Sequence, residues 1–380
     1  MPLEALQLRP ESRRRWHGPG LTRRGERVLN ALSAVVVALL AVGWGYSVAT
    51  LRQAEARNLP MPDAALTPTG RAVTTALTNA DAPTAAYVEG AAVEAMTSLR
   101  GRSGKLRARI QPTGEPLPSD ANVVVASDGE VATDATPVPS RPGLWRVGVA
   151  VGKVLRPVAD FNVIALHPFA EKRQGRIGQY LLGSWPGERG AVRGPARAPA
   201  SKYANPAGFI EVTRDNQTTR VSEHFKLQDF LTHNQPNVWP KYLVLRPELI
   251  DKLELVLNDL QRRGVKTAGV RVMSGFRTPS YNAGGGNTGG RANLSRHMYG
   301  DASDIFIDND GNGNMDDLNG DGRVDIGDSR FILESVERVE RAHPELVGGA
   351  GVYVACCGHG PFIHIDTRGY RARWVGTGSG

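Results

Sequence analysis

The chain has few cysteines: two among 380 residues, Cys356 and Cys357, which are adjacent. Adjacent cysteines form a disulfide only with strain, and this pair does not match the CxxC spacing of zinc ribbons or redox motifs. We therefore expect both to be small, buried, apolar residues in a strand. Cysteine usage then says little about the redox compartment.

The chain also lacks a basic stripe with interleaved aromatic residues. Its net charge of +8 is modest, and much of it lies in the first 28 residues and in an Arg- and Pro-rich segment further on. A nucleic-acid partner is therefore not expected. The hydrophobic fraction of 41% and the charged fraction of 22% are ordinary for a globular protein.

Charge is absent from residues 28–51, which are rich in Ala, Val and Leu. An uncharged run of ~20 residues or more is long enough to span a bilayer as a helix. The preceding arginines place the N-terminus in the cytoplasm. We expect a cytoplasmic tail over residues 1–28, a single-pass transmembrane anchor over 29–51, and a periplasmic remainder. A signal peptide cleaved after Ser47-Val48-Ala49 is the alternative.

Composition divides the rest of the chain. Residues 52–104 contain a Pro-rich stretch and predict a stalk. Short β-like runs separated by turn residues predict a small all-β module over 105–185. Residues 186–207 predict a linker or an irregular surface strap. The C-terminal domain, 208–380, has helical periodicity over 247–263 and 329–341, and strand-like runs at 209–213, 270–274, 351–355 and 362–366.

Two stretches of the C-terminal domain contain metal-ligand residues. SRHMYGDASD, residues 295–304, places His297 and Asp304 seven residues apart, with Gly300 between them. FIHID, residues 362–366, adds His364. Two imidazoles and one carboxylate form a three-ligand set for catalytic zinc, which leaves the fourth position to water. Glycine and small residues suit a backbone that curls tightly around an ion.

Together with SGFRTPSYN at residues 274–282, these stretches resemble the signature of zinc D-alanyl-D-alanine carboxypeptidases and related murein endopeptidases, the VanY-like peptidases. The resemblance covers residues 208–374. It implies an α+β domain with a small antiparallel sheet and flanking helices. It also implies that His297, Asp304 and His364 bind zinc, and that Arg277 steadies the oxyanion.

The general base is left open by one departure from the family pattern. Many members carry Glu or Asp three residues before the last zinc histidine, where this chain has Pro361. His359 or Asp366 could handle protons instead. Asp366 could also orient the imidazole of His364, because residues two apart in a strand share a face. We further expect Ser295 and Tyr299 to line the pocket. Three further histidines, His224, His233 and His343, are expected to be structural or superficial.

The resemblance implies a membrane-anchored peptidase that hydrolyses the peptide stems of peptidoglycan through a zinc-activated water. It leaves open whether the enzyme trims a terminal D-alanine or cuts a cross-link. The absence of a carboxylate at Pro361 keeps a non-catalytic, murein-binding protein with a degenerate zinc site as the alternative. A calcium-dependent adhesion module would explain the insert described next, but not the motifs above.

An aspartate-rich insert occupies residues 308–328. Residues 301–328 contain nine aspartates and one basic residue, Arg323. Such a density of carboxylates repels itself without cations. From Asp317 the spacing is that of an EF-hand-type calcium loop, with Gly322 at the sixth place and the remaining ligand positions at Asp317, Asn319, Asp321, Arg323, Asp325 and Asp328. An overlapping second set comprises Asp308, Asp310 and Asn312, with Gly313 and Asp316 nearby. We expect calcium in this insert.

Overall fold

The computed structural model describes residues 99–117, 123–127, 138–151, 154–189, 200–284, 292–356 and 358–376. The predicted tail, the predicted anchor and most of the predicted stalk lie outside these ranges. Within them, no helix combines the length and apolar character needed to cross a membrane. Membrane anchoring therefore stays a prediction from the sequence.

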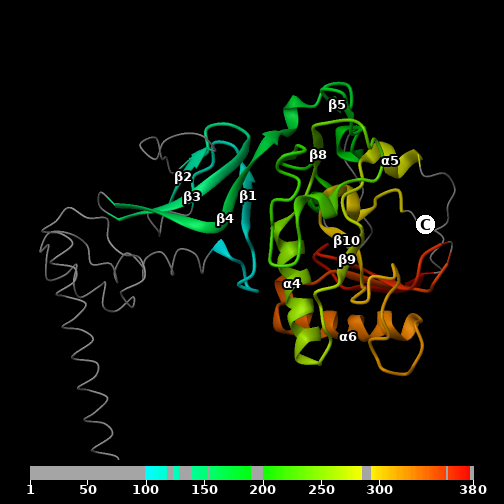
Figure 1. The fold of residues 1–380 in the computed structure, drawn as a ribbon. Helices are drawn as coiled ribbons and strands as arrows, with labels where there is room; N and C mark the ends of the chain where they lie inside the picture. Colours follow the sequence, from blue (N-terminus) through cyan, green and yellow to red (C-terminus); the bar gives the residue numbers. More distant parts are fainter. Residues whose placement is uncertain are drawn as a thin grey trace, which may run out of the picture. The chain divides into compact units, whose positions relative to one another are not determined.

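The first sheet contains β1 to β4 from the predicted β-rich module and two strands from beyond it. Its order is β2-β3-β4-β7-β8, and β1 pairs with β4 in parallel. The sheet crosses the predicted boundary at residue 208, because β4 pairs with β7 through His167–Phe209 and Pro168–Gly208. The strands are β1 (Ala108–Pro112), β2 (Val123–Ser127), β3 (Gly143–Val151), β4 (Val154–Pro168), β7 (Gly208–Val212) and β8 (Lys241–Leu243) (Figure 1).

The second sheet belongs to the C-terminal domain and has the order β13-β11-β12-β10-β9. Its pairings are antiparallel except for β13, which runs parallel to β11. The predicted α+β character is thus confirmed, with one parallel edge strand. The strands are β9 (Val270–Ser274), β10 (Ala302–Ile307), β11 (Gly349–Tyr353), β12 (Phe362–Asp366) and β13 (Ala372–Gly376).

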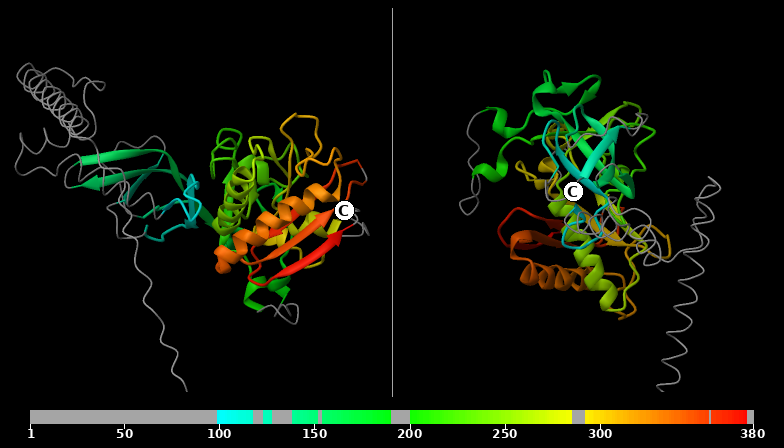
Figure 2. Two further views of the ribbon diagram at one scale, coloured as in Figure 1. Left: turned by 90° about the horizontal axis from the view of Figure 1, so that it is seen from below. Right: turned by 90° about the vertical axis from the view of Figure 1, so that its left-hand side faces the viewer.

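Two long helices flank this sheet, α4 (Pro247–Arg262) and α6 (Ile326–Ala342). α6 contacts both β11 and β12, and α4 packs beside α6 (Figure 2). Lys252 is a buried residue of α4, and its Nζ donates to Glu340 Oε1 on α6 at 2.7 Å and to the carbonyl of Asp366 on β12 at 2.7 Å. A buried ammonium with two acceptors links the two helices to the strand that carries the predicted metal ligand His364.

Short elements complete the fold. A two-stranded hairpin pairs β5 (Arg176–Ile177) with β6 (Tyr180–Leu181). The remaining helical turns are α5 (Pro279–Gly284), η2 (Phe169–Glu171), η3 (Pro186–Arg189), η4 (Ala200–Tyr203), η5 (Leu227–Phe230), η6 (Arg296–Tyr299) and η7 (Pro344–Leu346).

The predicted start of α6 and the predicted state of the cysteines both need correction. α6 begins at Ile326 rather than 329, because Asp325 and Asp328 form a capping box that satisfies its first N–H groups. Cys356 is half-buried and disulfide-bonded, not a buried apolar thiol. It lies beyond the end of β11, where reciprocal backbone bonds with His359 turn the chain back.

Both ends of the predicted linker are anchored in the core. Trp185, directly before it, is fully buried, and Tyr203, near its end, is buried too. The Trp185 indole lies beside Phe209 and Phe276, and its Nε1 donates to the carbonyl of Met298 at 2.8 Å. The chain before the linker therefore holds η6, the turn that carries His297, through a buried hydrogen bond.

We expect Trp185→Ala to lower the free energy of unfolding by about 3–5 kcal/mol, the usual loss when a large buried aromatic side chain is removed. Urea unfolding followed by far-UV circular dichroism measures this change. The exposed neighbour Ser184 gives the control, since Ser184→Ala removes no core contact. Equal stability of the two variants would contradict the anchoring role.

Candidate metal centre

The register between β10 and β12 brings two of the predicted metal ligands together. Asp304 on β10 lies directly opposite His364 on β12, and on its other side it pairs with Ser274 of β9. Directly opposed residues share a face of the sheet with Cβ atoms roughly 4.5–5.5 Å apart. The two side chains therefore point into the same space from neighbouring strands.

His297 reaches this space from η6, the turn immediately before β10. The turn closes at Gly300, whose φ of +67° suits glycine. A Cβ at Gly300 would lie 2.4 Å from the backbone of Val244. Behind the turn, Arg296 forms a buried ion pair with Asp301 and lies over the rings of Tyr203 and Tyr299. This packing fixes the turn from the side opposite to His297.

Three ligand atoms converge from these elements: His297 Nε2, Asp304 Oδ1 and His364 Nδ1. Asp304 Oδ1 lies 3.3 Å from His297 Nε2 and 2.8 Å from His364 Nδ1, and the two nitrogens are 3.1 Å apart. Tetrahedral ligands at 2.0–2.1 Å from zinc lie roughly 3.3 Å from one another. The spacing thus fits a tetrahedral ion with outward shifts of a few tenths of an ångström.

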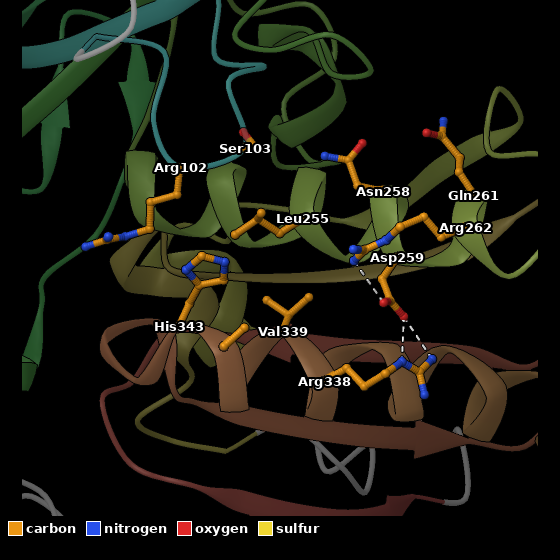
Figure 3. Close-up of a pocket in the computed structure, with 11 residues that line it drawn as sticks. Arg102, Ser103, Leu255, Asn258, Asp259, Gln261, Arg262, Arg338, Val339 and His343 are labelled. Carbon is orange, nitrogen blue, oxygen red and sulfur yellow. Dashed lines mark hydrogen bonds and ion pairs between the residues drawn. The ribbon is translucent and has the colours of Figure 1, made fainter. Parts of the chain in front are cut away.

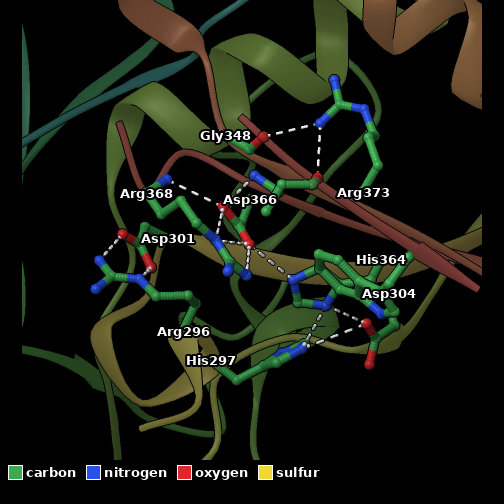
Figure 4. A network of polar contacts seen from close by, with 12 residues as sticks. Arg296, His297, Asp301, Asp304, Gly348, His364, Asp366, Arg368 and Arg373 are labelled. Carbon is green, nitrogen blue, oxygen red and sulfur yellow. Dashed lines mark hydrogen bonds and ion pairs between the residues drawn. The ribbon is translucent and has the colours of Figure 1, made fainter. Parts of the chain in front are cut away.

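In each imidazole, a hydrogen bond to one ring nitrogen leaves the other nitrogen to bind a metal. Figure 4 shows this bond for His364, which contacts Asp366. His297 Nδ1 lies 2.7 Å from the carbonyl of Gly275, which can only accept, so Nδ1 carries the proton and Nε2 is left to bind a metal. His364 Nε2 donates to Asp366 Oδ2 at 3.0 Å, which leaves Nδ1. Such partners orient metal-binding histidines and raise their basicity.

Asp366 is fully buried and is bonded to His364 on the nitrogen that does not face Asp304. It accepts a bond from Gly349 N at 2.7 Å and pairs with Arg368. Burial alone would raise the pKa of Asp366, but the bonds from His364 and Arg368 hold it well below its usual range. Two roles were predicted for Asp366. Its geometry fits a residue that orients the His364 ring and does not fit one that transfers a proton to a substrate.

The electrostatics keep His297 neutral and Asp304 ionised, as metal binding requires, whereas His364 favours its protonated form and must release a proton when it binds a metal. Burial and the neighbouring Arg277 charge lower the pKa of His297 to about 4, so its ring is neutral at neutral pH, as a metal ligand must be. Burial alone would raise the pKa of Asp304, but His297, His364 and Arg277 keep it well below its usual value. Burial alone would lower the pKa of His364, whereas its bonds with Asp304 and Asp366 raise it.

A pocket of about 180 Å³ opens beside Asp304, whereas His297 and His364 are not part of its lining. Its polar lining comprises Thr232, His233, Ser274, Arg277, Tyr281, Asp304 and His359. Arg277, at the end of β9, donates through Nε to Ser274 Oγ and through Nη2 to Asp304 Oδ2, both at 2.8 Å. A guanidinium has five N–H donors, and these bonds use two of them. Arg277 therefore combines a bond to a metal ligand with a place in the pocket wall.

Two histidines face this pocket, and only one of them was predicted as functional. His359 lies in the turn before β12, with its Nδ1 donating to the carbonyl of Gly360 at 2.8 Å. His233 was predicted to be structural or superficial, but it lines the pocket, where burial and Arg277 lower its pKa. No spacing signal in the sequence links it to the motifs.

Other predicted residues lie away from the pocket. Tyr299 is fully buried against Tyr203, and Ser295 is buried beside it, so the prediction that they line the pocket is wrong. His224 is bonded to Glu254, as a structural histidine. His343 lines a larger cavity of about 610 Å³ between α4 and α6, where Arg262 and Arg338 both bond Asp259 (Figure 3). That cavity contains none of the ligands described above.

The insert presents its two predicted calcium sets differently. Asp308 and Asp310 come together with Asp316, each offering an oxygen within 4.8 Å of the others, while Asn312 donates to Asp310 through its amide. In the EF-hand-type set, Asp317 accepts bonds from the N–H groups of residues 320–322, and Asp328 from those of residues 318, 319 and 325. Calcium at Asp317, Asn319, Asp321, Arg323 and Asp328 stays a prediction.

Comparison of this chain with family models, with curated proteins and with solved structures finds no match.

We expect the chain to bind one zinc ion and the variants His297→Ala, Asp304→Ala and His364→Ala each to lose it, because two ligands hold zinc poorly. Asp366→Asn should retain the site but weaken zinc affinity roughly 10–100-fold through a misoriented His364. Metal analysis after dialysis against a zinc buffer series measures both effects. His343→Ala, outside the site, is the control. Full zinc occupancy in all three ligand variants would refute the assignment.

Proposed function

We propose that the chain is a zinc peptidase that hydrolyses the peptide stems of peptidoglycan. The observation that carries the proposal is the convergence of His297, Asp304 and His364, with both imidazoles oriented by a second bond, beside a pocket that contains Arg277. Three protein ligands with an open fourth position are typical of catalytic zinc rather than structural zinc. The resemblance of the three sequence motifs to VanY-like peptidases supplies the substrate class.

When bound, zinc supplies a Lewis acid and lowers the pKa of a coordinated water to about 7. The chain contributes the remaining electrostatics. Arg277 directs a permanent positive charge into the pocket next to Asp304, where it stabilises the negative charge that develops on the scissile carbonyl oxygen. The bond to Ser274 fixes the guanidinium before substrate arrives.

Hydrolysis also requires a proton for the departing amine as the C–N bond breaks. No Glu or Asp occupies the usual position, where Pro361 is buried instead. Among the titratable residues that line the pocket, His359 is the closest in sequence to that position, and its Nδ1 donates to the carbonyl of Gly360. We assign the proton exchange with substrate to its imidazole. His233 lines the same pocket.

The direct test is digestion of purified murein by the full chain, with zinc or with a chelator, followed by mass spectrometry of the products. Release of D-alanine identifies a carboxypeptidase, and conversion of cross-linked stems to single stems identifies an endopeptidase. Either product should disappear with chelator and in His297→Ala. Murein binding without any product at saturating zinc would instead establish the non-catalytic, murein-binding alternative.

We expect Arg277→Ala to lower kcat roughly 10²–10³-fold at saturating zinc, the usual effect of removing one oxyanion donor. Because Arg277 also bonds Asp304, zinc affinity should fall as well, and the zinc titration separates the two effects. Ser274→Ala removes the Nε partner that orients Arg277 but keeps its charge, so it should lower kcat by less than Arg277→Ala. Full recovery of kcat in Arg277→Ala with excess zinc would show that Arg277 acts only through Asp304.

A further inference from the structure

A second cluster of potential metal ligands lies at the other end of the strand that carries Asp304. β10 ends at Ile307, and the next residue, Asp308, lies with Asp310 and Asp316 so that one oxygen of each falls within 4.8 Å of the others. Asp308 is buried, Asp316 is half-buried and Asp310 is exposed. Three carboxylates this close repel one another unless a cation or protons neutralise them.

One atom of this cluster has no partner in the protein. Asp308 Oδ1 is buried without a hydrogen bond, in a side chain that is only 4% exposed. The other oxygen, Oδ2, accepts from Gly313 N at 3.2 Å and lies 3.7 Å from the exposed Arg271 Nε. A buried carboxylate oxygen without a hydrogen bond or a cation is unfavourable. A cation at the cluster would satisfy it.

The neighbouring loop is shaped to hold the other two carboxylates. Asp316 N donates to the carbonyl of Ile307 at 2.7 Å, which closes the loop back onto the end of β10. The carboxylate of Asp316 accepts hydrogen bonds from the backbone and side-chain nitrogens of Asn309. The carboxylate of Asp310 accepts one from the backbone N–H of Asn312. Each ionised carboxylate offers about four acceptor sites, so these bonds leave capacity for a metal.

We propose that Asp308, Asp310 and Asp316 bind a divalent cation of the calcium class and that this ion fixes the loop between β10 and α6. An all-oxygen ligand set in a partly exposed, irregular loop suits calcium, whereas zinc favours the nitrogen-containing set around Asp304. The predicted ligand Asn312 serves instead as a donor to Asp310.

The same loop supports the wall of the zinc pocket. A Cβ on Gly360 would lie 3.0 Å from Asn314 Oδ1 and 3.5 Å from Met315 N, so the loop packs closely against the residue after His359. Met315 itself is 1% exposed and belongs to the hydrophobic core. Calcium would thus order both the loop and the turn that presents His359. This last step rests on the proposed peptidase function, whereas calcium binding does not.

The test uses the full chain, stripped of metal by chelator, titrated with calcium chloride in a calorimeter and by thermal unfolding. A ligand that binds only the folded state at 100 times its Kd should raise the Tm by roughly 5–10 °C. The rise should persist in His297→Ala, which lacks the zinc site. The variant with Asp310→Asn and Asp316→Asn should bind one calcium ion fewer per chain and show a smaller rise. Its Tm in chelator should be no lower than that of the unmodified chain, because charge repulsion has been relieved.

The matched control is Asp317→Asn combined with Asp321→Asn, which removes as many charges from the EF-hand-type loop. Loss of one calcium ion per chain in the Asp310/Asp316 variant supports the proposal. Loss in the control alone, with normal binding in the Asp310/Asp316 variant, would overturn it and assign calcium to the other loop. A Tm and calorimetric signal indifferent to millimolar calcium in the unmodified chain would overturn it as well.

Discussion

The antiparallel register of β10 against β12 is the constraint on which the candidate centre depends. It sets Asp304 beside His364 on one face, while Ile305, Ile363 and Ile365 are buried in the core on the other. A slip by one residue would turn every side chain of the slipped strand to the opposite face. The register that buries the isoleucines is therefore also the one that joins carboxylate and imidazole, so the fold and the metal centre are stabilised together.

Behind the ligands, a buried polar network holds their orientation. The carboxylate of Asp366 accepts hydrogen bonds from His364, Gly349 and Arg368. Its backbone carbonyl accepts one from the buried Lys252 of α4, which also donates to Glu340 of α6. Such a network is favourable only when its members are paired, since an unpaired buried charge is very costly. The network therefore holds both flanking helices in place relative to β12. It also holds the imidazole of His364 in one ring orientation.

The two proposed metal sites share one short strand but differ in ligand chemistry. Asp304 lies within β10 among two imidazoles, whereas Asp308 follows its end among carboxylates alone. Nitrogen ligands in a fixed, dry site select zinc, and a flexible all-oxygen site selects calcium. A cation at Asp308 would stabilise the loop beyond β10 and, through Asn314 and Gly360, the turn that bears His359. The arrangement gives a physical route by which one ion could support the surroundings of the other.

The sequence by itself determined the motif residues and the elements with strong local signals. The strands at residues 270–274 and 362–366 and the helix that begins at Pro247 form where periodicity predicted them, and His297, Asp304 and His364 meet as their motifs implied. The tertiary structure was needed to choose between the two roles that spacing left open for Asp366, and to show that His233 lines the pocket and that Trp185 anchors the turn of His297. These roles arise from contacts between residues tens to more than a hundred positions apart or from the direction of one side chain, neither of which local spacing encodes. Periodicity indicates which face of a helix or strand is apolar. Which other element packs against that face depends on the tertiary structure.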